Sequence, residues 1–139
     1  MKSVIICGSI LAEDDIILVR DTLESIGHEV EIPYGVYQYL DNGKKHLPDK
    51  ERADQKIDQD LISRYFHLIK KFDVVLVVNV EKNGVKNYIG GNTFLEMGFG
   101  HVLQKVIYTL NPLPEEVGYL DEIKAIKPVI LNGDLTLIG

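Results

Sequence analysis

One segment of the chain places a carboxylate beside a glycine-rich turn. Residues 90–93 have the sequence GGNT, and the apolar positions that follow predict a helix to about Leu103. Glu96 is expected in the first turn of that helix, where free backbone N–H groups and the positive end of the helix dipole favour an ionised carboxylate. Such a carboxylate can attack the anomeric carbon of a sugar and trap the oxocarbenium-like transition state covalently. Glu96 is therefore a candidate nucleophile.

A purely structural role for Glu96 is the main alternative. Thr93 and Glu96 have the spacing of a capping box, in which the glutamate side chain only reaches back to the N–H of the threonine. Gly98 and Gly100 weaken this alternative slightly, because a glycine inside a helix costs about 1 kcal/mol relative to alanine. Close approach of a ligand, the sheet or another helix would explain them.

A second motif ends the first predicted strand. Cys7 is followed by Gly8, Ser9 and Ile10, so a glycine turn and a hydroxyl precede a helix. Such a turn can hold a phosphate or a sugar oxygen, although an ordinary strand-to-helix turn explains it equally well. The Cys7 thiol could be reactive near a helix N-terminus, but free cysteines are usually buried.

The elements that would position these residues alternate along the chain. Strands are predicted at 4–7, 28–33, 74–78, 106–110 and 128–131, with helices at about 16–26, 51–71, 93–103 and 119–126. The continuous apolar run at 74–78 is typical of a central strand buried on both faces. This order predicts a flavodoxin-like, Rossmann-like three-layer α/β sandwich with a five-stranded parallel sheet in the order 2-1-3-4-5. Ligands of such sheets bind beyond the carboxyl ends of the strands, where Asn79 and Asn111 also lie.

The apolar residues of the stretch 34–50 show neither a helical nor a strand period. It contains Tyr34, Tyr37 and Tyr39 together with Asn42-Gly43 and Pro48, so it is interpreted as a loop. The tyrosines could form a lid or a pocket wall, or they could pack a surface loop. From 51 to 71 one long amphipathic helix is predicted.

Composition excludes several classes of protein. The chain has 139 residues and a formal net charge of −6, which fits one domain over 1–139 and gives no positive stripe for nucleic acid. No apolar stretch approaches the roughly 18 residues of a membrane span. One cysteine cannot form an internal disulfide, so a cytoplasmic location is expected. The four histidines share no metal-ligand spacing, so no metal site is predicted.

These motifs resemble one known family. The segment from Cys7 to Ile10, the strand after Asp73 and the sequence FLEMG around Glu96 resemble the nucleoside 2-deoxyribosyltransferase superfamily. Within it, the pattern is most similar to that of the 2′-deoxynucleoside 5′-phosphate N-hydrolases. The resemblance covers most of the chain in element order, but its specific motifs are confined to about residues 4–10 and 73–112.

The resemblance implies roles for individual residues. Glu96 would be the nucleophile, Ser9 would contact the 5′ side of the substrate, and residues 90–93 would form the ribose-phosphate loop. A homodimer or higher homo-oligomer is implied as well. The chain departs from the family at Ile5, where the family has a tyrosine, and at Tyr65, where it has an aspartate. Two serines that bind the 5′-phosphate are replaced by Gly90 and Leu120, so a requirement for this phosphate is not implied.

The sequence therefore predicts an N-glycosidase or deoxyribosyltransferase that acts on a nucleoside or nucleotide through Glu96. No cofactor, metal, membrane or nucleic-acid partner is expected. The alternative is a nucleotide-binding sensor that has kept the pocket and lost catalysis. The predicted substrate-binding residues lie at the carboxyl edge of the sheet, and they are Gly8, Ser9, Ile10, Asn79, Gly90, Gly91, Asn92, Thr93 and Asn111.

Overall fold

The sheet has the predicted strands, directions and order. The computed structural model describes residues 1–46, 48–58 and 60–139. Five parallel strands are arranged in the order β2-β1-β3-β4-β5, which is the flavodoxin-like arrangement. The strands are β1 (Ser3–Gly8), β2 (Glu29–Glu31), β3 (Val74–Val78), β4 (Val106–Thr109) and β5 (Val129–Ile130).

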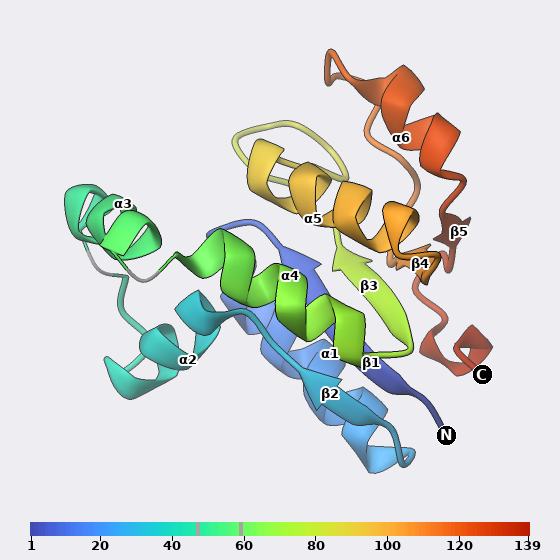
Figure 1. Ribbon diagram of the computed structural model, residues 1–139, viewed down its shortest axis with the longest axis horizontal. Coiled ribbons are helices and arrows are strands. Elements are labelled where there is room, and N and C mark those ends of the chain that lie inside the picture. Colours follow the sequence, from blue (N-terminus) through green and yellow to red (C-terminus); the bar gives the residue numbers. More distant parts are fainter. Residues whose placement is uncertain (47, 59) are drawn as a thin grey trace.

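Helices cover both faces of the sheet (Figure 1). One face packs against α1 (Glu13–Ser25) and the C-terminal 3₁₀ turn η1 (Leu135–Leu137). The other face packs against α4 (Leu61–Lys71), α5 (Gly91–Val102) and α6 (Leu120–Ile126). Alternate residues of a strand point to opposite faces, so Ile6 packs toward α1 while Ile5 and Cys7 pack toward α4 and α5. All five residues of β3 are buried, as its continuous apolar sequence predicts.

The segment between β2 and β3 differs from the prediction. The predicted loop at 34–50 contains the helix α2 (Tyr34–Asp41), which starts directly after Pro33. The predicted single helix at 51–71 is two helices, α3 (Asp49–Asp58) and α4. Asp60 explains the break, because its φ of 47° is left-handed and its side chain accepts a hydrogen bond from the Ser63 N–H at 3.3 Å. An aspartate that caps a new helix cannot continue the previous one.

Polar contacts attach the α2–α3 segment to α1. The Tyr39 hydroxyl donates to Asp14 at 3.2 Å, and Nε2 of His46 lies 2.7 Å from a carboxylate oxygen of Glu13. Helix α3 itself lies outermost, away from the sheet (Figure 1). The segment is therefore held at its middle, and α2 is kept close to the carboxyl end of β2.

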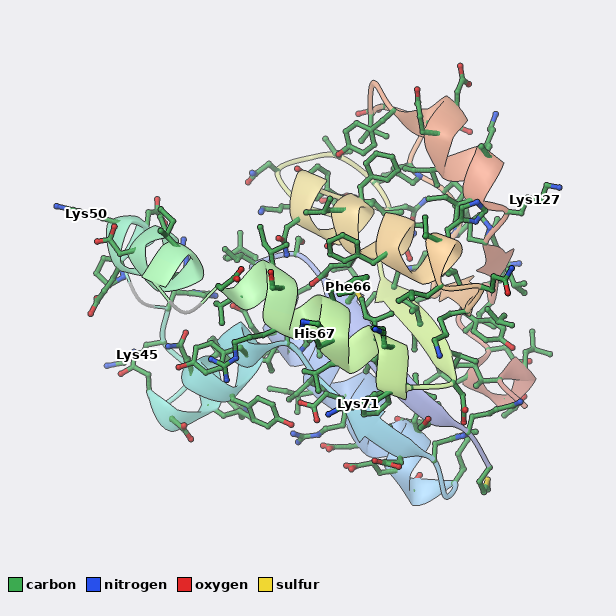
Figure 2. The ribbon with its side chains drawn as sticks, viewed as in Figure 1. Lys45, Lys50, Phe66, His67, Lys71 and Lys127 are labelled. Atoms are coloured by element: carbon green, nitrogen blue, oxygen red, sulfur yellow. The ribbon has the colours of Figure 1, made fainter. Side chains whose placement is uncertain are left out.

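Helices α4 and α5 pack side by side on one face of the sheet. Phe66 lies between them (Figure 2), with its ring edge-on to Phe99 and the centroids 5.1 Å apart. This packing sets the distance between the two helices that frame the candidate site. Among the described residues, no helix has the length and apolar character needed to cross a bilayer.

Candidate active site

A cavity of about 350 Å³ opens at the carboxyl ends of β1 and β2. Its volume lies within the range of roughly 300–1,000 Å³ that is usual for small-molecule sites. Helices α2 and α4 and the first turns of α5 supply most of its walls. The lining residues from β1, its following turn and α5 are Gly8, Ile10, Asn92, Leu95 and Glu96. The rest come from β2 and the helices after it, and include Glu31, Ile32, Pro33, Tyr34, Tyr37, Arg52, Ile62, Arg64, Tyr65 and Leu68.

Glu96 lies in the second turn of α5 and faces this cavity. The helix begins at Gly91 with Gly90 as its N-cap, so the predicted first-turn position of Glu96 is wrong. The capping box is wrong for the same reason, because Thr93 is inside the helix and buried. Glu96 is therefore not at the N3 position that a capping box requires. Although the residue is only 8% exposed, it lines the cavity and can meet a bound molecule.

The thiol of Cys7 lies next to Glu96 on the face of the sheet that α5 covers. Burial raises the pKa of this thiol well above its usual value, and the negative charge of Glu96 and a hydrogen bond to its side chain raise it further. A protonated thiol is a donor, so Cys7 helps to orient the carboxylate. The same shift argues against a reactive Cys7, because the thiolate is the nucleophilic form.

Tyr65 brings a phenol hydroxyl from α4 to the same region. This hydroxyl donates to the carbonyl of Ile6, and the residue is 6% exposed. The β1–β2 register pairs Val4 with Val30 and Ile5 with Glu31, so its continuation directs the Ile6 carbonyl toward the nitrogen of Pro33. Proline has no N–H, which leaves this carbonyl for Tyr65. Burial raises the pKa of the Tyr65 phenol well above its usual value, with smaller contributions from Cys7 and Glu96.

The other predicted binding residues divide into two groups. Gly8, Ile10 and Asn92 line the cavity together with Glu96. The remaining six are not among the described residues that line it, and they are Ser9, Asn79, Gly90, Gly91, Thr93 and Asn111. Their binding roles stay predictions. Two of them, Asn79 and Asn111, make hydrogen bonds that hold neighbouring strand ends together.

Asn79 and Asn111 hydrogen-bond to each other across the ends of β3 and β4. The Asn79 side chain donates to the carbonyls of Asn111 and Pro112 at 3.1 and 2.9 Å. It also accepts from the Asn111 N–H at 2.9 Å, while the Asn111 side chain donates to the Asn79 carbonyl at 2.8 Å. The Thr109 hydroxyl adds a bond to the Asn111 carbonyl at 2.8 Å. We call Asn79, Thr109 and Asn111 the asparagine bridge.

The two glycines inside α5 have different surroundings. A side chain at Gly100 would meet Val75 of β3 at 3.1 Å, so this glycine lets α5 approach the sheet closely. Apart from its chain neighbours and the nearby backbone of α5, no described atom lies within 4 Å of the position that a Cβ at Gly98 would occupy. The sheet therefore explains Gly100, and nothing in the structure explains Gly98.

Several cavity residues were missed by the sequence analysis. Glu31 ends β2 just before Pro33, so it was detectable by the rule that singled out Asn79: a polar residue at the carboxyl end of a strand. Tyr34 and Tyr37 confirm the pocket-wall alternative for part of the 34–50 stretch. Arg52 and Arg64 had no detectable signal, because their placement around one cavity depends on the break between α3 and α4.

Comparison with known proteins adds no assignment. No protein-family model matches the chain, and no characterised protein matches its sequence. Among the residues that the structure describes, no group of three or more His, Cys, Asp or Glu side chains could hold a metal ion. The chemical interpretation therefore depends on the cavity and on the motif residues themselves.

Proposed function

We propose that the cavity binds a nucleoside or nucleotide and that Glu96 cleaves its N-glycosidic bond. The observation that carries this proposal is the Glu96 carboxylate in the wall of a cavity of about 350 Å³ at the carboxyl edge of the sheet. The cavity offers different chemistry on its two sides. Glu96, Asn92 and the Gly8 turn suit the hydroxyls of a sugar, whereas the aliphatic and aromatic side chains from β2, α2 and α4 suit a flat base.

The proposed reaction has two steps. A carboxylate oxygen of Glu96 attacks the anomeric carbon while the C–N bond breaks, and the bonding electrons leave with the base, which takes a proton from water. Water then attacks the glycosyl ester and releases the free sugar and the Glu96 carboxylate. In transfer, a second base replaces water in this step. The Cys7 thiol holds Glu96 in place and takes no direct part in bond exchange.

The resemblance to the nucleoside 2-deoxyribosyltransferase superfamily supports the same chemistry, because Glu96 occupies the position of the nucleophile. It also supports a homodimer or higher homo-oligomer as part of the proposal, and the single cysteine supports a cytoplasmic location. The Tyr65 hydroxyl stands where the family has an aspartate, and Ile5 stands where it has a tyrosine. This chain would therefore use a hydroxyl from α4 in place of one from β1.

Base release tests the proposal directly. The purified protein is incubated with a panel of ribo- and deoxynucleosides and their 5′-monophosphates, and free base is measured by chromatography. We expect Glu96→Gln to lower kcat by roughly a thousandfold or more, since the nucleophile is lost. Glu122→Gln is the matched control, because Glu122 is an exposed residue of α6 that is not among the described residues lining the cavity.

The covalent intermediate gives a second readout. A slow fluorinated substrate analogue should leave a sugar adduct on the peptide that contains Glu96, detected by mass spectrometry after acid quenching. Release of base at the same rate from the Glu96→Gln protein, or an adduct on another residue, would contradict the proposal.

A nucleotide sensor without catalysis is the second candidate. The replacement of the family aspartate by Tyr65 favours it, because no described carboxylate takes that position on α4. This candidate predicts nucleotide binding without any release of base, and binding that is unchanged in Glu96→Ala. Base release that depends on Glu96 would exclude it.

A further inference from the structure

The cavity contains a second carboxylate, which the proposed mechanism does not use. Glu31 is the last residue of β2, and it lines the cavity beside Ile32 and Pro33. These residues and the aromatic side chain of Tyr34 belong to the apolar side of the cavity, where the base would lie. A carboxylate on this side is placed to contact the edge of the base.

The orientation of Glu31 is set by Tyr37 of α2. The Tyr37 hydroxyl donates to Oε1 of Glu31 at 3.1 Å. Burial raises the pKa of the Tyr37 phenol, and the charge and hydrogen bond of Glu31 raise it further, so the hydroxyl remains a donor. An ionised carboxylate has two acceptor oxygens with about four lone-pair sites, so one bond from Tyr37 leaves capacity for a ligand.

A carboxylate distinguishes bases by the groups on their edges. It accepts hydrogen bonds and donates none, so it attracts an exocyclic amino group and repels a carbonyl oxygen at the same place. Adenine and cytosine present an amino group where hypoxanthine and uracil present a carbonyl. The neighbouring ring nitrogen changes as well, from an acceptor to an N–H donor, so a single acceptor separates the two classes when it meets the exocyclic group itself.

We propose that Glu31 accepts a hydrogen bond from the exocyclic amino group of the base and so selects amino-bearing nucleosides over their oxo counterparts. This inference rests on the proposed function in one respect, namely that the cavity binds a nucleoside. It does not require that the nucleoside is cleaved.

Calorimetric binding measures this selectivity without turnover. The Glu96→Gln protein is titrated with deoxyadenosine and deoxyinosine, and then with deoxycytidine and deoxyuridine. We expect the amino-bearing member of each pair to bind about tenfold or more tightly, as a hydrogen bond to a charged group implies. In the Glu96→Gln protein that also carries Glu31→Gln, the ratio of the two affinities in each pair should fall close to one. An amide can turn to donate to a carbonyl as readily as it accepts from an amine.

Glu29→Gln is the matched control. It makes the same chemical change in the same strand, but Glu29 is exposed and is not among the described residues lining the cavity. Its ratios should equal those of the parent. Tyr37→Phe is the second variant, and it should reduce the ratios partially, since Glu31 loses the hydroxyl that holds it.

The outcomes separate this inference from the proposed function. Unchanged ratios in both Glu31→Gln and Tyr37→Phe would overturn the role of Glu31, even if Glu96 proves essential for base release. Ratios that depend on Glu31 would support the inference, even if no nucleoside is hydrolysed. Failure of these nucleosides and of their 5′-monophosphates to bind would overturn both.

Discussion

Two parts of the carboxyl edge of the sheet carry polar side chains, and they use them differently. At the ends of β3 and β4, the side-chain amide of Asn79 bonds to the backbone of Asn111 and Pro112, and that of Asn111 bonds to the backbone carbonyl of Asn79. At the ends of β1 and β2, Glu31 and Glu96 face a cavity. Both parts fit the general rule for ligand sites in open α/β sheets, and among the described residues the cavity of about 350 Å³ lies at the second.

The difference follows from the connections after the strands. The chain after β4 turns back at Asn111 and Pro112, so its backbone comes close enough to bond to the Asn79 side chain. The chain after β2 instead enters α2, whose Val36 packs with α1, while α4 packs beside α5 on the other face of the sheet, and the cavity lies between these helices. A polar residue at a strand end therefore indicates a site only where the following segment moves away from the sheet.

The largest effect on stability is expected at the asparagine bridge. Asn79→Ala removes a fully buried side chain that makes three hydrogen bonds, and it leaves the Asn111 N–H and two carbonyls without these partners. We expect the free energy of unfolding to fall by about 2–3 kcal/mol, because buried polar groups that lose their partners are costly. Urea unfolding followed by circular dichroism measures this change.

Asn92→Ala tests the cavity side of the comparison. Asn92 is exposed in the first turn of α5 and lines the cavity, so its loss should weaken nucleoside binding and leave unfolding nearly unchanged. If Asn79→Ala weakened binding while stability stayed constant, the bridge would belong to the site and the comparison would fail.

The same contrast shows what sequence could and could not predict. The strands, their order and the helix after Gly91 follow from local apolar patterns and from the rules of parallel sheets. Glu96 could be selected from the sequence because the glycines around it are close to it in the chain. The mutual bonding of Asn79 and Asn111 could not, since it joins residues that lie 32 positions apart.

The segment between β2 and β3 was the least predictable part of the fold. Its apolar spacing from 51 to 71 is compatible with one continuous helix, and only the backbone at Asp60 shows the break. Without that break, Arg52 and Arg64 could not be placed around one cavity. Tyr65 lies within the helix predicted at 51–71, but the bond of its hydroxyl to the Ile6 carbonyl depends on Pro33, which provides no donor there.

Tyr65→Phe should have a smaller effect than Asn79→Ala. The change keeps the ring in the core and removes only the hydroxyl that bonds to the Ile6 carbonyl. We expect a loss of about 1 kcal/mol in the free energy of unfolding, which is typical of one buried hydrogen bond. Tyr37→Phe is the matched control, since its more exposed hydroxyl bonds to a carboxylate in contact with solvent, and its unfolding should change little. Equal losses in the two variants would show that the Ile6 carbonyl finds another donor.

The smallest expected effect is a dependence of stability on alkaline pH, to which Cys7 and Tyr65 on the cavity side contribute and the asparagine bridge does not. Cys7 and Tyr65 have pKa values raised above their ordinary 9.0 and 10.0, mainly by burial. Below the ordinary values both groups are protonated in the folded and unfolded states, so their full contribution to stability is present. Above them the unfolded chain releases protons that the folded chain retains, so stability falls as the pH rises.

Urea midpoints measured under reducing conditions from about pH 7 to pH 11 test this dependence. The decline should become shallower in Tyr65→Phe, which lacks the phenol. Asn79→Ala should lower the midpoint at every pH without changing the slope, because the asparagine bridge contains no titratable side chain. A slope that Tyr65→Phe leaves unchanged would mean that Tyr65 already titrates normally in the folded protein, which its bond to the Ile6 carbonyl and its burial argue against.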